Sequence, residues 1–292
     1  MANSKQQITP YFFLLPGFIF LGVWLIYPAT RAVWMSLHEW TVIPSAPKTF
    51  IWFENYIKIF SDPIFWPALR NTLLYALVTV CGQILLGVGI AILVDSLRKG
   101  QVFFRVSFYL PVVTSWVVVS LLFKYLFNSS PSGYINFLLV NQLKILPSPI
   151  AWLNEAATAW VAIDSLGIWK GVGWTMVIIL AALQSLPEEC FDSASIDGAN
   201  RWQSLVYIKL PLLAPTIVLV IIMLTIGAFQ AYIPIALITN GGPLHRTEVM
   251  LSYMYSKAFS DQEFGYSSAL AFISAAIVFG ISRLQMSAKR KV

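Results

Sequence analysis

Six long apolar runs divide the chain, and the segments between them hold most of its charged residues. The apolar runs cover residues 11–37, 72–94, 102–127, 165–186, 212–238 and 266–281. A helix needs roughly 20 apolar residues to cross the hydrocarbon core of a bilayer, and each run has about that length. The pattern therefore predicts an all-α, polytopic integral membrane protein with about six transmembrane helices.

The composition agrees with a chain that faces lipid. Hydrophobic residues make up 58% of the chain and charged residues only 11%, too few to cover a soluble domain of this length. Aromatic residues make up 15%, which suits rings that lie at two membrane–water interfaces. We expect a cytoplasmic tail over residues 1–10, one transmembrane domain over residues 11–286, and a basic cytoplasmic tail over residues 287–292.

The basic residues predict the orientation. If the N-terminus is cytoplasmic, more than half of the Lys and Arg residues fall in short inside segments beside helix ends. That bias is typical of cytoplasmic loops. We therefore expect both termini on the cytoplasmic side of a bacterial or archaeal inner membrane. The remaining basic residues are scattered and form no patch, so we expect no nucleic-acid partner.

Few residues offer enzyme or metal chemistry. Cys81 and Cys190 fall in different regions, and neither begins a C-x-x-C pair. His38 and His245 stand outside any H-E-x-x-H motif, and no G-x-x-x-x-G-K-[ST] phosphate loop is present. We therefore expect no catalytic residue, metal or cofactor in this chain, and a membrane-embedded enzyme is the less favoured alternative.

The segment 187–211, between the fourth and fifth runs, has a distinct pattern. Glu188 and Glu189 follow a proline, which favours a helix start because carboxylates suit the N-terminal dipole. Gly198 can adopt the positive φ that stops this helix, and we expect Asp197 to cap the next one. That second helix should cover residues 199–210 and carry Trp202 on its apolar face. An amphipathic connector on the membrane surface would share these features.

This segment resembles the EAA loop of the permease subunits of binding-protein-dependent ABC importers. The loop has the form P-E-x-x-x-E-A-A-x-x-D-G-A, followed by an aromatic stretch that ends in L-P. Matching positions are Pro187, Glu188, Ala194, Asp197, Gly198, Ala199, Leu210 and Pro211. Asp192 stands for the family's Glu and Ser193 for its first Ala. The stretch T-N-G-G-P at 239–243 is similar to an outer loop of the carbohydrate branch, the maltose and glycerol-3-phosphate type.

The resemblance implies the partners and the coupling residues. The chain would pair with a second permease, two ATP-binding cassette subunits that hold ATP and Mg, and a periplasmic or lipid-anchored solute-binding protein. Contacts with the ATPase would then come from Glu188, Glu189, Asp192, Ser193, Ala194, Asp197, Gly198, Ala199 and Trp202. The implied solute is a sugar or sugar-like molecule, with glycerol-3-phosphate or another polar solute as the alternative. A receptor is a third possibility, and it would leave the loop unexplained.

Two stretches inside the apolar runs are candidates for the solute path, because polar positions at membrane depth are tolerated where they line a cavity. Their glycines could equally serve helix packing. The candidate residues are Trp169, Lys170, Gly171, Trp174 and Thr175 in the fourth run, and Gly227, Gln230, Ala231 and Tyr232 in the fifth. We expect Gln230 and Trp174 to share one cavity. Lys170 should lie near the outer end of its helix, where it either snorkels to the interface or faces an anionic solute.

Overall fold

The computed structural model describes residues 4–41, 48–97, 99–187 and 189–289. Helices dominate these residues, as the sequence predicts. Within the described part, five helices are long and apolar enough to cross a membrane, and a bent helix pair makes up to six. The five are Phe13–Ser36, Phe65–Asp95, Ala156–Gln184, Arg201–Phe229 and Phe264–Ser287, and the pair is Gln101–Val113 with Trp116–Leu126. All six predicted runs are therefore confirmed as helical.

The chain forms two compact units. The first unit comprises residues 1–63 and 254–273. Its elements are α1 (Ser4–Leu21), the π-helical turn η1 (Gly22–Ile26), α2 (Tyr27–Ser36), β1 (His38–Glu39), β2 (Thr49–Phe50), α3 (Glu54–Ser61), η4 (Ser256–Ser260) and the beginning of α14 (Phe264–Lys289). Asn55 joins α3 to the end of α2, because its amide donates to the carbonyls of Ser36 at 2.8 Å and His38 at 3.1 Å.

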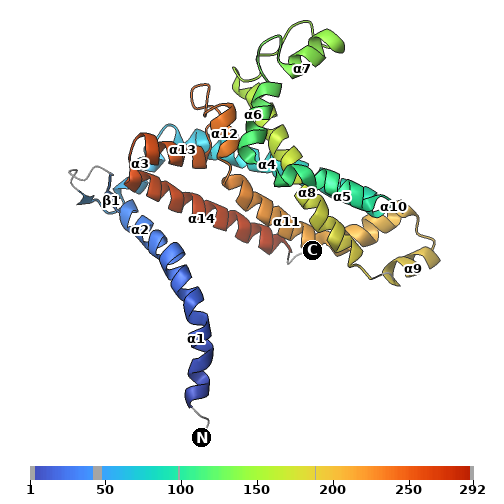
Figure 1. Cartoon of the computed structure of the whole chain (residues 1–292), viewed down its shortest axis with the longest axis horizontal. Helices are drawn as coiled ribbons and strands as arrows, with labels where there is room; N and C mark the ends of the chain where they lie inside the picture. The colour runs from blue at the N-terminus through green and yellow to red at the C-terminus, as the bar shows by residue number, and fades with distance from the viewer. Residues whose placement is uncertain (1–3, 42–47, 98, 188, 290–292) are drawn as a thin grey trace. The chain divides into compact units, whose positions relative to one another are not determined.

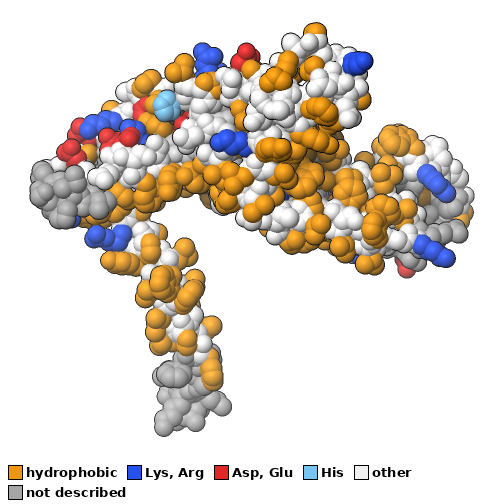
Figure 2. Space-filling view, turned by 45° about the horizontal axis from the view of Figure 1, so that its top comes forward, with side chains coloured by type: hydrophobic (Ala, Val, Ile, Leu, Met, Phe, Trp, Pro, Cys, Tyr) orange, Lys and Arg blue, Asp and Glu red, His pale blue; other side chains and the backbone are white. Residues whose placement is uncertain are grey.

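Most of the N-terminal helix of the first unit has no partner within the described chain. In the most apolar 18-residue window of Phe13–Ser36 no residue is buried, and only its end at Ser36 is buried against α3. Hydrophobic side chains cover its visible face (Figure 2). An apolar surface of this extent requires lipid or another subunit around it.

The second unit comprises residues 64–253 and 274–292. Its elements are α4 (Phe65–Asp95), α5 (Gln101–Val113), α6 (Trp116–Leu126), α7 (Tyr134–Asn136), η2 (Phe137–Gln142), α8 (Ala156–Gln184), α9 (Glu189–Ile196), α10 (Arg201–Ser204), η3 (Leu205–Lys209), α11 (Leu210–Phe229), α12 (Ile233–Ile238), most of α13 (Met250–Tyr255) and the rest of α14. The short helices α9 and α10 lie at one end of α8, and α7 lies at the other (Figure 1).

Helices α4 and α8 form the centre of the second unit and run parallel. Near their beginnings, the rings of Tyr75 and Trp160 lie 6.1 Å apart. Further along, Gln83 donates to the carbonyl of Gly167 at 3.3 Å. At their ends, Val94 and Leu183 belong to one hydrophobic cluster. Both helices therefore end on the side of the unit that carries α9 and α10.

The third predicted run is not one straight helix, because α5 and α6 meet at an angle of 92°. Thr114 and Ser115, between them, have extended backbones with ψ of 150° and 132°. Since α4 and α8 run parallel, the chain between them must return the full length of α8, about 43 Å. The α5–α6 pair makes this return, so it is a broken crossing rather than a re-entrant loop.

Helices α11 and α14 run in opposite directions. Gln285, near the end of α14, donates to the hydroxyl of Thr225 in α11 at 3.0 Å. Ile277 and Val278, earlier in α14, pack on the cluster that contains Phe229, at the end of α11. The described C-terminal part of α14 therefore points to the end of the unit where α9 and α10 lie.

The fourth and fifth runs begin earlier than the sequence predicts. Helix α8 starts at Ala156 rather than near residue 165, which places Lys170 at its centre. The fifth membrane helix is continuous from Arg201 to Phe229, so Pro211 does not mark its start. Proline fits there without a break, because it stands in the first turn of α11, directly after the wider turn η3.

Candidate solute pocket and coupling loop

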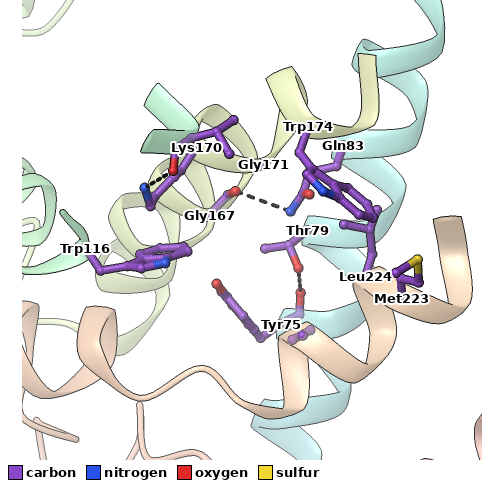
Figure 3. Close-up of a pocket in the computed structure, with 13 residues that line it drawn as sticks. Tyr75, Thr79, Gln83, Trp116, Gly167, Lys170, Gly171, Trp174, Met223 and Leu224 are labelled. Carbon is purple, nitrogen blue, oxygen red and sulfur yellow. Dashed lines mark hydrogen bonds between the residues drawn. The ribbon is translucent and has the colours of Figure 1, made fainter. Parts of the chain in front are cut away.

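A pocket of about 340 Å³ lies between α4, α8, α11 and the junction of α5 with α6. Its polar and aromatic lining consists of Tyr75, Thr79, Gln83, Trp116, Lys170 and Trp174 (Figure 3). The rest of the lining is small or apolar: Val112, Gly167, Gly171, Met223, Leu224, Gly227 and Ala228. Rings, an amide and a hydroxyl therefore face one space inside the membrane domain.

Three polar side chains of α4 form a stripe along the pocket. Tyr75, Thr79 and Gln83 are spaced four residues apart, so they share one helix face. Gln83 is only 8% exposed, and no described residue donates to its Oε1. A buried amide oxygen without a donor costs about 1–3 kcal/mol, so a hydroxyl that reaches Gln83 Oε1 from the pocket would be stabilised there.

Glycines on α8 make room for this stripe. A Cβ atom at Gly167 would lie 2.7 Å from the hydroxyl oxygen of Tyr75, and a Cβ at Gly171 would overlap the amide of Gln83. Side chains at these positions would therefore push α4 away or displace the polar groups. In Figure 3, the stripe of α4 faces these glycines and Trp174 directly.

Lys170 is buried, with 3% of its surface exposed, although it stands at the centre of α8. Its ammonium donates to the carbonyls of Pro111 at 2.9 Å, Val112 at 3.1 Å and Thr114 at 2.6 Å. It also lies 4.8 Å from the centre of the Trp116 ring. The predicted place at the outer end of the helix, from which Lys170 would snorkel, is therefore wrong, because α8 begins well before it.

Several residues predicted for the solute path lie outside this pocket. Gln230 is exposed and forms the C-cap of α11, so the cavity predicted for Gln230 and Trp174 together is wrong. The polar groups opposite Trp174 come from α4 instead. Trp169 is 45% exposed and its ring lies 5.7 Å from that of Phe123. Thr175 is fully buried, and Ala231 and Tyr232 are half-buried between α11 and α12.

In the segment 187–211, α9 is the first helix that the sequence predicts, whereas the second, predicted over residues 199–210, is the beginning of a longer helix that runs from Arg201 to Phe229. Gly198 has a φ of +75°, and the amide of Ala199 donates to the carbonyl of Ala194 at 2.9 Å. This is the Schellman arrangement that ends α9 at a glycine, so the predicted stop is confirmed. The predicted cap at Asp197 is wrong. Asn200 caps α10 in a capping box with Gln203, because it stands directly before the first helical residue.

Most of the predicted coupling residues face outward. Glu189, Asp192, Ser193, Asp197, Gly198 and Trp202 are exposed, Ala199 is half-buried, and Ala194 is buried against the unit. Glu188 lies outside the described residues. The exposed coupling residues of α9 and α10 therefore include acidic and aromatic side chains, and Ala194 is the buried one among those described.

A lysine joins this segment to α4. Lys209 lies 3.5 Å from the carboxylate of Asp95, the last residue of α4, and its ammonium is 5.3 Å from the centre of the Phe191 ring in α9. We call these three residues the latch. It connects the exposed helix α9 to the same helix that carries the polar stripe of the pocket.

Comparison with known proteins places this architecture in a family. Residues 83–292 match the family described as "Binding-protein-dependent transport system inner membrane component". The chain belongs to this family. It is an ABC transporter permease, a membrane subunit of an importer.

Individual relatives cover nearly the whole permease. The "Probable ABC transporter permease protein YurN" of Bacillus subtilis is 34% identical, over 97% of this chain and 96% of its own length. The "Sulfoquinovosyl glycerol transport system permease protein SmoG" of Agrobacterium fabrum is 34% identical over 93% and 87%. A bacterial alginate ABC transporter, solved with an alginate pentasaccharide-bound periplasmic protein, has the same fold at 22% identity. Its TM-score is 0.83 over 98% of this chain and 96% of that one.

Sequence reasoning missed the α4 side of the permease's pocket. Tyr75, Thr79 and Gln83 stand in an apolar run, and their four-residue spacing was the available signal. Trp116 and the latch residues gave no such signal, because they come together only through the break after α5 and the packing of α9.

Proposed function

We propose that this permease is one of two transmembrane subunits of an ATP-driven importer for a sugar, oligosaccharide or glycoside. A periplasmic or lipid-anchored solute-binding protein delivers the solute, and a second permease completes the path. Two ATP-binding cassette subunits, with ATP and Mg, drive the transport. The main support for a sugar as the solute is the lining of the pocket, which combines aromatic rings with a buried amide.

Sugars match the chemistry of this pocket. Their ring faces stack on aromatic side chains, here Trp116 and Trp174, and their hydroxyls bond amides and phenols, here Gln83 and Tyr75. The unpaired Oε1 of Gln83 would accept a sugar hydroxyl. Relatives named for the transport of sulfoquinovosyl glycerol and of alginate support a glycoside as the solute.

The exposed face of α9 and α10 supports the coupling role. In the proposed mechanism, the ATPase binds this face, including Asp192 and Trp202, together with Glu188, which precedes α9 in the sequence, and moves when ATP closes its two copies. Because a packed interface switches between discrete arrangements, α9 would move as a rigid body. The latch would pass that movement to α4. Because the ATPase is a cytoplasmic partner, the proposal implies that the end of the second unit with α9 and α10 faces the cytoplasm. Both termini of the chain are then cytoplasmic as well.

Reconstitution of the full complex tests the proposal. The tagged permease would be purified with its partner permease, ATPases and binding protein, and placed in liposomes. We expect ATP-dependent uptake of a radiolabelled disaccharide or oligosaccharide that the binding protein retains. Uptake of glycerol-3-phosphate with no uptake of any sugar would favour the alternative solute. Uptake without ATP, or without the binding protein, would contradict the proposed mechanism.

A further inference from the structure

A helix that ends inside a membrane leaves its last carbonyls without intrahelical partners. Helix α5 ends in this way at Val113, and the chain continues in an extended conformation before α6. Water cannot satisfy such groups in the hydrocarbon core, so protein groups must do so. The ammonium of Lys170 supplies three donors, and the carbonyls of Pro111, Val112 and Thr114 accept from it.

The charge of Lys170 is balanced by this helix end. The C-terminus of a helix carries a partial negative charge, which stabilises a cation placed against it. The ring of Trp116, 4.8 Å from the ammonium, adds a cation–π contact. Among the described residues, Lys170 forms no ion pair with a carboxylate. All three of its donors are therefore engaged before any solute arrives.

The break that Lys170 holds is also a wall of the pocket. Val112 lies just before the break and Trp116 just after it, and both line the pocket. Figure 3 shows Lys170 and Trp116 at one side of the pocket, across from the stripe of α4. The position of this wall depends on the angle between α5 and α6, which the three hydrogen bonds fix.

We propose that Lys170 is a positioning residue that fixes the broken helix pair and so places Val112 and Trp116 against the solute. It does not bind the solute itself. Of the described charged side chains, only Lys170 lines the pocket, so the part of the solute that enters here is an uncharged sugar ring. An acidic group on the solute is met elsewhere. This inference rests on the proposed function only for the nature of the solute.

The positioning role can be tested without transport. Cys81→Ser and Cys190→Ser remove the native thiols, and Val112→Cys adds a reporter in the wall. The assembled complex in membranes would be labelled with N-ethylmaleimide. Replacing Lys170 by Met, a similar apolar chain without donors, should raise the labelling rate about tenfold, because three charge-assisted hydrogen bonds are lost. Lys170→Arg keeps the charge and supplies N–H donors, so its labelling rate should stay closer to that of the Lys170 protein than to that of Lys170→Met.

A second reporter separates local movement from unfolding. Trp160→Cys, near the beginning of α8, should react at the same rate with Lys170, Met or Arg at position 170. If Lys170→Met leaves the rate at Val112→Cys unchanged, the proposal is wrong. A rise of the same size at both reporters would equally overturn it, because the lysine would then support the whole fold. If Lys170→Met does not assemble, Lys170→Gln, which keeps an amide donor, takes its place with an intermediate rate expected.

Uptake of two solutes separates positioning from solute binding. In the reconstituted complex, Lys170→Met should reduce the uptake of a neutral disaccharide by about tenfold, and Lys170→Arg should restore most of it. A solute-binding lysine would give another result, in which Lys170→Met spares a neutral sugar and abolishes only uptake of an acidic one. If the Lys170 protein moves no sugar at all, the proposed function fails, while the labelling result still decides the role of the lysine.

Discussion

At the residue scale, two glutamines offer a matched comparison. Gln83 is buried in the pocket and its Oε1 accepts no hydrogen bond from the described residues, whereas Gln230 is exposed outside the pocket. We predict that Gln83→Leu lowers uptake about tenfold, because a hydrogen bond to the solute is worth roughly 1–3 kcal/mol. Gln230→Leu should change uptake by less than about twofold. Initial uptake rates in proteoliposomes, at equal amounts of assembled complex, measure both.

Basal ATPase activity serves as the control for this comparison. Since neither glutamine lies near α9 or α10, both variants should hydrolyse ATP at the rate of the parent protein without solute. An equal loss of uptake in the two variants would contradict the assignment of the pocket. A loss in Gln230→Leu alone would place the solute at the end of α11, as the sequence pattern suggested.

A glycine on α8 gives a second prediction at this scale. Because a Cβ at Gly171 would overlap the Gln83 amide, Gly171→Ala must push that amide out of its place. We expect uptake to fall about tenfold, as it does for loss of the hydrogen bond itself. Gly89→Ala is the control, since a Cβ there meets nothing within 4 Å. If the two alanine variants transport equally well, Gly171 does not hold the amide in the pocket.

At the scale of elements, substitutions at the turn after α9 distinguish the effect of backbone strain from the effect of a lost side-chain contact. Gly198 has a φ of +75°, and a Cβ there would meet nothing within 4 Å. Gly198→Val should therefore act only through the backbone, at a cost on the order of 1–3 kcal/mol. We predict that ATPase stimulation by the loaded binding protein and uptake fall together. Gly198→Asn, which tolerates this conformation, should retain most of both activities.

The amount of Gly198→Val protein in the membrane shows whether the substitution acts only at the turn. The membrane helices do not involve Gly198, so the valine variant should reach the membrane at the parent level. Normal transport by Gly198→Val would show that this turn has no part in coupling. An asparagine variant as impaired as the valine variant would mean that the ATPase touches the bare glycine itself.

A separate prediction tests whether the latch passes the movement of α9 to α4. Lys209→Met removes its ion pair with Asp95, which is partly exposed and worth at most about 1 kcal/mol. We predict a fall of about twofold to fivefold in the number of solute molecules moved per ATP. The double variant Asp95→Lys with Lys209→Asp restores opposite charges and should recover part of this ratio. Lys99→Met, at an exposed position beyond α4, should leave the ratio unchanged.

The elements differ in how far the sequence could predict them. The Gly198 stop was predictable, because positive φ is a local property of one residue type. The cap at Asn200 rather than Asp197 depended on where α10 begins, which local pattern places only within a few residues. The break between α5 and α6 lies inside a continuous apolar run. Thr114 bonds the carbonyl of Pro111 locally, but Lys170, which is distant in sequence, also binds three carbonyls there, so the pattern of the run alone could not predict the angle.

At the scale of the whole molecule, apolar run length predicted the six membrane segments but not which of them face each other. The pocket depends on α4 and α8 running in parallel, with the stripe of Tyr75, Thr79 and Gln83 opposite Gly167 and Gly171. The pairing of α4 with α8 is a tertiary contact between segments that are distant in sequence. The four-residue spacing of polar side chains on α4 was the only sign of it in the sequence. The family resemblance predicted the permease family correctly, because it rested on a local motif, and the coupling role of that loop stays a prediction.

The last prediction concerns the crossing of the α5–α6 pair. If the pair crosses the membrane, the chain has six crossings, and both termini lie on the side of α9 and α10. A re-entrant pair would give five crossings and place the termini on opposite sides. The parallel course of α4 and α8 requires a crossing, and we predict that the side with α9 and α10 is cytoplasmic, because the short segments on that side hold more than half of the Lys and Arg residues. In a background without Cys81 and Cys190, single cysteines at Lys99, just before α5, and at Ser132, after α6, report the sides on which the pair begins and ends. We expect a membrane-impermeant maleimide, applied to spheroplasts, to label Ser132→Cys at once and Lys99→Cys only after the membrane is opened. Labelling of both in sealed spheroplasts would mean that α5 and α6 return to the side from which they came.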